Sequence, residues 1–207
     1  FRATRDLDMV LIVEALTPEF GEKFWKFIVD GKYRNKAKND SNPQFYRFDK
    51  PEDERFPKMI ELFSRTNYLL QEENGLTPIH IDDSVSSLSA ILLNDAYYQA
   101  LMDGRENMRG ISVLKPEWII PFKAKAWLDL REKKDVDSSD IKKHRNDIIR
   151  IVSDMVLQKC ILPDEVRKDM EKFIEQFDVT ESELKNLKIR GTKPEDIKRV
   201  LQTTYLD

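Results

Sequence analysis

The feature that most constrains the fold is an apolar run from Leu7 to Val13, which only Asp8 interrupts. The run has the length of a buried strand, and alternate residues of a strand lie on the same face. Asp6 and Asp8 therefore share one face at the mouth of the run. Two carboxylates held side by side repel each other unless a cation lies between them, and Mg2+ prefers oxygen ligands. The pair is therefore a candidate metal site; the alternative is two surface aspartates at a strand start.

A second apolar strand is predicted over Lys58 to Phe63, and it contains the acidic residue Glu61. The period of two places Glu61 on one face with Met59, and Ile60 on the other. A lone buried acid is unfavourable without a partner. Two interpretations stay open. Glu61 forms a salt bridge with a neighbouring basic residue or faces water at a sheet edge, or it acts beside the two aspartates.

Strand and helix signals alternate over the first 115 residues, which is typical of an α/β region. Thr17 and Pro18 begin a helix as its N-cap and first residue, and Gly31 is expected to end it at the C′ position. Residues 32–43 and 105–110 are expected to be loops. Shorter elements are predicted at 45–48, 79–81, 96–102 and 111–114; residues 85–93 fit either a strand or a helix.

From Pro116 onward the pattern is helical only. Helices are predicted over 116–131, from Ser138 or Ser139 to 157, and from 163 to 177. Thr180 and Glu183 form a capping box that opens a fourth, Gly191 breaks it, and a last helix covers 194–201. The sequence thus predicts an α+β protein with two domains, 1–115 and 116–207.

Two charged residues lie among apolar ones on these helices. Lys123 has apolar residues one turn before and one turn after it, so it either snorkels from the edge of the core or points at an anion. Lys125 is expected to pair with Asp129 at i+4. Asp147 lies beside the apolar stripe of the next helix, and its simplest role is an ion pair with Lys143 at i−4.

Composition excludes several classes of protein. The chain has 207 residues, 40% of them hydrophobic and 35% charged, which fits a globular, helix-leaning protein rather than a disordered one. Its 35 Lys and Arg are matched by 38 Asp and Glu, so overall charge does not indicate nucleic-acid binding. No apolar stretch approaches the ~20 residues that span a bilayer, and there is no signal peptide, so we expect a cytoplasmic protein without a membrane partner.

Cys160 is the sole cysteine, which allows no intramolecular disulfide and fits a reducing compartment. We expect it to be a small buried residue in an amphipathic helix. The two histidines, His80 and His144, have no metal-ligand spacing, and we expect both to be structural or surface residues.

The residues Arg2, Thr4, Asp6, Leu7 and Asp8 follow the pattern Arg-x-[Ser/Thr]-x-Asp-[Ile/Leu]-Asp at the start of an apolar strand. This pattern resembles the Asp-x-Asp motif of the polymerase-beta-type nucleotidyltransferases. It is most similar to the AbiEii-like branch of bacterial type IV toxin–antitoxin and phage-defence systems.

Further motifs follow in the order of that branch, from residue 2 to about 150. The superfamily has a third acid in an apolar strand, to which Glu61 is similar although it is Glu rather than Asp. The branch has a Lys-x-x-Ala helix motif, which Lys123 begins here, and an aspartate in a basic run, which Asp147 resembles. The superfamily also has a Gly-[Gly/Ser] turn ahead of the Asp-x-Asp, which holds the nucleotide phosphates. The sequence starts at Phe1 after that point, and we expect the natural N-terminus to lie upstream.

The resemblance implies a mixed sheet with flanking helices, followed by a helical C-terminal bundle. It implies Mg2+- or Mn2+-dependent transfer of NMP from an NTP such as ATP to an RNA (tRNA) or protein acceptor. The implied metal ligands are Asp6, Asp8 and Glu61, and Glu61 is alternatively the base. The implied nucleotide-binding residues are Lys123, Asp147, Arg2 and Arg5.

The resemblance further implies a toxin of a two-gene module with a cognate antitoxin as partner. Two alternatives stay open. The chain is a catalytically degenerate nucleotidyltransferase-fold module that binds RNA or a protein partner, or the acids are salt-bridged to Arg2, Arg5 and Lys123 and serve structure alone.

Overall fold

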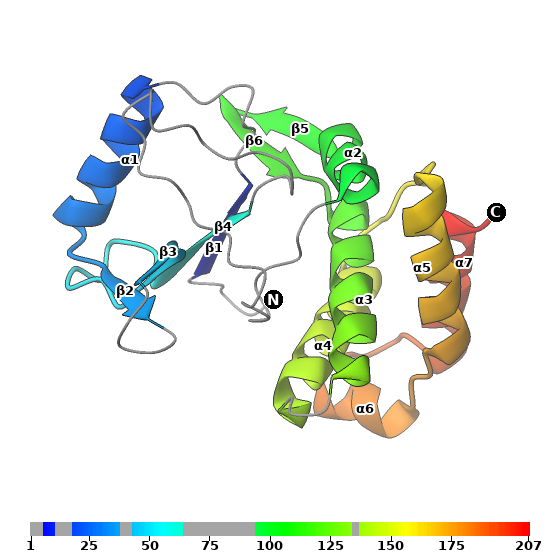
Figure 1. The fold of residues 1–207 in the computed structure, drawn as a ribbon. Helices are drawn as coiled ribbons and strands as arrows, with labels where there is room; N and C mark the ends of the chain where they lie inside the picture. Colours follow the sequence, from blue (N-terminus) through cyan, green and yellow to red (C-terminus); the bar gives the residue numbers. More distant parts are fainter. Residues whose placement is uncertain (1–5, 11–17, 38–42, 64–93, 134–136) are drawn as a thin grey trace. The chain divides into compact units, whose positions relative to one another are not determined.

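The computed structural model describes residues 6–10, 18–37, 43–63, 94–133 and 137–207 (Figure 1). The chain divides into two compact units, Phe1–Asn94 and Asp95–Asp207, which we call the sheet unit and the helical unit. This boundary precedes the expected one at 115, because helix α2 (Asp95–Asp103) packs against helices that belong to the helical unit. The expected strand at 79–81 and the ambiguous segment 85–93 lie outside the described residues.

The sheet unit contains a mixed four-stranded sheet in the order β1-β4-β3-β2. Its strands are β1 (Asp6–Val10), β2 (Arg34–Ala37), β3 (Pro43–Asp49) and β4 (Met59–Phe63). The pair β1–β4 is parallel, and the pairs β4–β3 and β3–β2 are antiparallel. The strand predictions at 45–48 and 58–63 are confirmed. The loop expected at 32–43 is wrong over β2, whose polar residues show no alternation.

Helix α1 (Pro18–Asp30) begins at the proline that the sequence indicates, and it covers one face of this sheet. Phe48 on β3 and Ile60 on β4 are register partners and are completely buried. The ring of Phe24 on α1 meets the ring of Phe48 edge to face, with centroids 5.6 Å apart, and Ile28 on the same helix is buried. The core of the sheet unit therefore lies between α1 and the face that holds Phe48 and Ile60.

The end of α1 corrects the expected role of Gly31. The left-handed C′ residue is Lys32, with φ of 49°, and its N–H donates to the carbonyl of Val29 at 3.0 Å. The N–H of Tyr33 donates to the carbonyl of Ile28 at 3.2 Å, which completes a Schellman motif. Gly31 precedes C′, and a Cβ there would lie 2.6 Å from the ring of Tyr33. Glycine is therefore favoured at position 31 because a larger side chain would collide with the ring of Tyr33, not because the backbone there has a positive φ.

The helical unit is built around α3 (Pro116–Glu132), which has α4 (Ser138–Asp154) and α5 (Asp164–Gln176) on its two sides (Figure 1). Helix α7 (Pro194–Tyr205) packs against α4 and α5, and the short helix α6 (Glu181–Asn186) precedes it. The predicted helices are confirmed, but their ends differ: α4 ends three residues earlier than expected, and α7 is four residues longer. The expectation that Gly191 breaks α6 is wrong, because the helix already ends at Asn186 and Lys188 takes the left-handed conformation. No helix in the described part of the chain is long and apolar enough to cross a membrane.

Aromatic side chains form the centre of this unit. The rings of Trp127 on α3 and Phe173 on α5 meet edge to face at 5.3 Å, and Phe177 lies 4.7 Å from Phe173. The hydroxyl of Tyr205 donates to the backbone carbonyl of Glu117, which joins the end of α7 to the start of α3. Other side chains that are completely buried are Ile120, Ile148, Ile149, Val166, Met170, Ile197 and Leu201.

The structure corrects several local expectations in the helical unit. Residues expected to be a loop form strand β5 (Arg105–Met108), which pairs with β6 (Ile111–Leu114) around a two-residue turn. Arg109 and Gly110 have φ of 54° and 86°, as a type I′ turn requires. Asp137, rather than Ser138 or Ser139, caps α4 by accepting the N–H of Ser139. The predicted capping box of Thr180 and Glu183 is confirmed.

Cys160 is buried as expected, but it does not lie in a helix. It occupies the extended segment between α4 and α5, where its N–H donates to the carbonyl of Thr204 at 2.9 Å. Burial and the nearby carboxylate of Glu117 raise the pKa of its thiol to about 12. The thiol is therefore protonated at neutral pH and unreactive as a nucleophile.

Candidate functional site

The acidic residues of the sheet unit lie on two neighbouring strands. Asp8 on β1 and Glu61 on β4 are register partners in the parallel pair. Neighbouring strands are about 4.8 Å apart, so the two backbone positions are adjacent. Asp6 is the register partner of Met59, two residues before Asp8 on the same strand. The backbone thus places the three predicted acids at two consecutive levels of one sheet face.

This face is the one opposite the core. Residues alternate between faces along a strand. Ile60 and Phe48, at the next position along β4 and β3, belong to the buried face that α1 covers. Glu61 and its partner Asp8 therefore belong to the face away from α1. The structure describes these acids by their backbone, and their carboxylate groups lie outside what it describes.

Strand β3 adds two charged residues that the sequence prediction missed. Arg47 is the register partner of Glu61, and Asp49 is the register partner of Met59. Asp8, Glu61 and Arg47 thus form one row across three strands. The signal that could have found Arg47 is its position directly before Phe48, because neighbouring residues of a strand lie on opposite faces.

The residue types in this row fit a hard divalent cation, since Asp and Glu supply the oxygen ligands that Mg2+ and Mn2+ take. Among the side chains that the structure describes, no group of three His, Cys, Asp or Glu residues is arranged to hold a metal ion. Two of the predicted nucleotide-binding residues, Arg2 and Arg5, lie outside the described residues.

In the helical unit, Lys123 on α3 and Asp147 on α4 form an ion pair. The ammonium of Lys123 donates to the carboxylate of Asp147 at 2.7 Å across 24 residues of sequence. Their side chains are 25% and 32% exposed, so solvent screens the pair only in part. Asp147 therefore pairs across two helices, and the local ion pair with Lys143 is not among the ion pairs of the described residues.

His144 lies one turn before Asp147 on α4 and adjoins the same pair. Burial lowers its pKa to about 4, and the positive charges of Lys123 and Lys143 lower it further than the carboxylates of Asp147 and Asp140 raise it. Its Nδ1 is buried and has no hydrogen-bond partner in the described part of the chain. His144 is thus a neutral structural residue at pH 7.

Lys125, two residues along α3, has a different environment. Its ammonium lies 3.0 Å from Asp129, as predicted, and 3.6 Å from Asp169 on α5. Asp169 also accepts a hydrogen bond of 2.9 Å from the hydroxyl of Tyr97 on α2. Lys125 therefore has two carboxylate partners, one on its own helix and one on α5, and is a structural residue.

Arg145, in the basic run before Asp147, is also structural. Its guanidinium donates to both carboxylate oxygens of Glu183 and to the backbone carbonyl of Asp178, and it lies over the ring of Phe177 with its Cζ 5.5 Å from the centroid. The hydrogen bonds from Arg145 lower the pKa of Glu183 to about 2. Arg145 thereby fixes α6 against α4.

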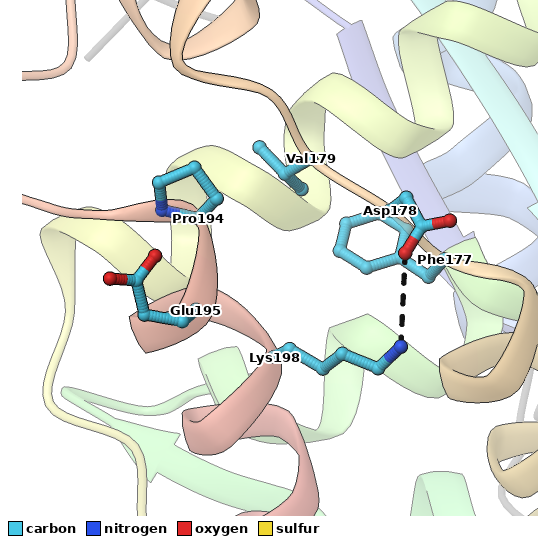
Figure 2. A pocket seen from close by; sticks show the side chains of 6 residues that line it. All are labelled: Phe177, Asp178, Val179, Pro194, Glu195 and Lys198. Atoms are coloured by element: carbon cyan, nitrogen blue, oxygen red, sulfur yellow. Dashed lines mark ion pairs between the residues drawn. The ribbon is translucent and has the colours of Figure 1, made fainter.

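Figure 2 shows a hollow of about 280 Å³ between the segment after α5 and the start of α7. Lys198 reaches across it toward Asp178, with the charged atoms 3.8 Å apart, while Glu195 is turned away from Lys198. Its lining residues are Phe177, Asp178, Val179, Pro194, Glu195 and Lys198. The hollow contains none of the predicted site residues, and its lysine is already paired.

The structure thus groups the predicted residues as two sets, one in each unit. Asp6, Asp8 and Glu61 share a face of the sheet, and Lys123 pairs with Asp147 between two helices. Comparison of the chain with protein-family models, with curated proteins and with solved structures finds no match.

Proposed function

We propose that the protein is a Mg2+- or Mn2+-dependent nucleotidyltransferase that moves NMP from an NTP to an RNA or protein acceptor. The observation that carries the proposal is the register of the sheet, in which Asp8 and Glu61 occupy adjacent positions and Asp6 lies two residues away on the same face. The order of the motifs along the chain and their resemblance to nucleotidyltransferases give it its reaction class.

Like charges at adjacent positions destabilise a sheet, and nothing in the apolar core benefits from them. A divalent cation held by Asp6, Asp8 and Glu61 removes this repulsion, and it supplies neutralisation of phosphate charge and activation of a hydroxyl group. Their place on the face away from α1 suits such a role, because residues on the covered face are buried against that helix.

In the reaction, the oxygen of the acceptor hydroxyl attacks the α-phosphorus of the NTP. A new phosphorus–oxygen bond forms, the bond between the α-phosphorus and the β-bridging oxygen breaks, and pyrophosphate leaves. The hydroxyl proton passes to the carboxylate of Glu61 or to solvent.

Lys123 is the proposed cation for the triphosphate, which a lysine binds as a point charge. Its partial exposure leaves it accessible, and Asp147 holds it in one orientation until a stronger anion competes. The expected partners are an NTP, an RNA such as tRNA or a protein as acceptor, and a cognate antitoxin.

The test measures pyrophosphate release and transfer of label from α-labelled NTPs to RNA and protein in the presence of Mg2+. We expect Asp8→Asn to lower transfer by on the order of 1,000-fold, because it removes a metal ligand. Asp30→Asn removes an equal charge from the exposed end of α1 and should leave transfer unchanged.

Nucleotide transfer at the wild-type rate in both Asp8→Asn and Glu61→Gln would contradict the proposal. Absence of transfer in the wild-type chain, together with RNA or protein binding that both variants retain, would instead favour a degenerate module that only binds. Binding of Mn2+, followed by its paramagnetic resonance signal, separates these outcomes because a degenerate module need not bind the metal.

A further inference from the structure

The segment from the last turn of α6 to the start of α7 is rich in basic residues. Residues 185–193 contain four cations and no acidic residue, in a chain whose overall charge is −3. Of the two acids that flank the segment, Glu183 is bound by Arg145. We call the four cations the basic loop: Lys185, Lys188, Arg190 and Lys193.

All four side chains of the basic loop are exposed, and none has an ion-pair partner among the described residues. Many other cations of the helical unit are paired, including Lys123, Lys125, Lys172 and Arg199. The positive charge of the basic loop is therefore not neutralised within the described structure.

The backbone of the basic loop is fixed at both ends. Lys188 has φ of 60° at the end of α6, where its N–H donates to the carbonyl of Lys185 at 3.0 Å. The N–H of Ile189 donates to the carbonyl of Leu184 at 2.9 Å, and Gly191, with φ of 78°, turns the chain toward α7. The N–H of Lys193 donates to the carboxylate of Asp196 at 3.2 Å. The spacing of the four cations is thus set before any partner binds.

Along the loop, the charged side chains are exposed and the apolar ones are half-buried. Lys188, Arg190 and Lys193 are exposed, whereas Ile189 and Thr192 between them are half-buried. A protein-binding surface is usually centred on aromatic or arginine anchors that fill well-packed pockets, and an anionic membrane surface binds through apolar burial as well as charge. The basic loop has no aromatic ring, either to act as such an anchor or to stack on a base, and no exposed apolar side chain.

We infer that the basic loop binds the phosphate backbone of a structured RNA without reading its sequence. Exposed Lys and Arg at fixed spacing are the groups that neutralise successive phosphates and release counterions. That this RNA is the acceptor of the transferred nucleotide rests on the proposed function; the binding itself does not.

The test measures binding of a fluorescein-labelled RNA hairpin to the full chain by anisotropy, over about 50–200 mM KCl. The loop variant replaces all four cations with Gln. A control variant replaces four exposed cations that lie far apart in the sequence of the helical unit: Arg105, Lys133, Lys142 and Lys168. The two variants have equal net charge, so a general electrostatic effect would weaken both alike. Circular dichroism checks that each retains its helices.

We expect the loop variant to bind RNA at least about 10-fold more weakly. The steepness with which log K falls with log salt should decrease by about 3, because each phosphate that the protein no longer neutralises removes roughly 0.7–0.9 from it. The control variant should keep most of the wild-type slope. A DNA hairpin of the same sequence reports whether binding extends beyond the shared phosphate backbone, and equal weakening of both by the loop substitutions supports the inference.

Three results would each overturn the inference. The first two are equal weakening of RNA binding in the control variant and absence of RNA binding by the wild-type chain. The third is displacement of the RNA by polyglutamate at equal charge concentration, which would favour an acidic protein partner. Asp8→Asn separates the inference from the proposed function, since it should bind RNA like the wild type. If the wild type binds RNA through the basic loop but transfers nothing, the proposed function fails and the inference stands.

Discussion

The sheet unit has opposite-charge register partners, such as Arg34 with Asp49 and Arg47 with Glu61, but unlike the ion pairs described in the helical unit it also places like charges side by side. In the helical unit, charges of opposite sign meet between helices, as in Lys123 with Asp147 and Lys125 with Asp169. In the sheet unit, residues of like charge occupy adjacent register positions, as in Asp8 with Glu61. The first arrangement stabilises a fold, and the second becomes favourable when a cation is bound. The like charges on the sheet therefore fit a role in binding a cation, and the ion pairs between the helices fit a role in stability.

The buried side chains described in the two units also differ. The described part of the sheet unit buries Ile28, Phe48 and Ile60, while the helical unit buries several aromatic rings in mutual contact. Aromatic side chains bury the largest areas, so the buried rings of the helical unit contribute much to its packing. Substitutions in the helical core should therefore have the largest effects on stability.

Phe173→Ala should destabilise the protein by about 3–5 kcal/mol, because the ring is completely buried between Trp127 and Phe177 and its removal leaves a cavity. Thermal and urea unfolding followed by circular dichroism measure the loss. Phe27→Ala, at a ring that is 38% exposed, is the matched control and should have a smaller effect. Equal losses would show that the two units do not differ in this way.

His144 should make the helical unit sensitive to mild acid. Its folded pKa of about 4 lies below the unfolded value of 6.5, so the unfolded state binds more protons between these values. Its contribution to stability is fully present above about pH 6.5 and is lost as pH falls through about 4. His144→Gln should flatten this part of the pH dependence by on the order of 1–2 kcal/mol, as urea unfolding at several pH values would measure. An unchanged profile would contradict the burial of the ring.

Asp147→Asn should destabilise the helical unit by about 1 kcal/mol, because it leaves the partly buried ammonium of Lys123 without its partner. A double-mutant cycle with Lys123→Gln isolates the contribution of the pair. A coupling energy near zero would mean that the two residues are held by their helices alone.

Asp8→Asn should have the opposite sign in metal-free buffer. Removing one of two like charges at adjacent register positions should stabilise the sheet unit by about 0.2–1 kcal/mol. Added Mg2+ should raise the melting temperature of the wild type and not of this variant. If the substitution destabilises the protein with or without Mg2+, the aspartate is a structural residue and the comparison between the two units fails.

Lys172→Gln should have the smallest effect. Its ion pair with Glu132 measures 2.9 Å, but the two side chains are 48% and 70% exposed, and screened surface pairs contribute little. We expect no measurable change in melting temperature. A clear decrease would mean that exposed pairs also contribute to the stability of the helical unit.

Much of the fold could be predicted because its signals are local. Pro18 and Pro116 mark helix starts that the structure places at the same residues, and the capping box of Thr180 with Glu183 is present. Strand β4 was predicted because all of its residues except Glu61 are apolar. Strands β2 and β5 were missed because their residues are polar, and pairing with a neighbouring strand, rather than local preference, makes them strands.

The candidate site was predictable only where its geometry is local. The shared face of Asp6 and Asp8 follows from their spacing alone. Asp147 has Lys143 at i−4, and no rule of spacing could select Lys123, which is 24 residues away, as its partner. The row of Asp8, Glu61 and Arg47 likewise depends on strand register, which local sequence does not determine.

The network around Lys125 has a consequence for its neighbour on α3. Lys125 pairs with Asp129 on α3 and Asp169 on α5, and Tyr97 on α2 donates to Asp169, so the network ties α3 to both neighbouring helices and restricts its rotation. Lys123, half a turn away on the same helix, therefore has its backbone direction set in advance. An anion that binds Lys123 needs to immobilise only the end of one side chain, so the entropy lost on binding is smaller than for a lysine on a mobile segment.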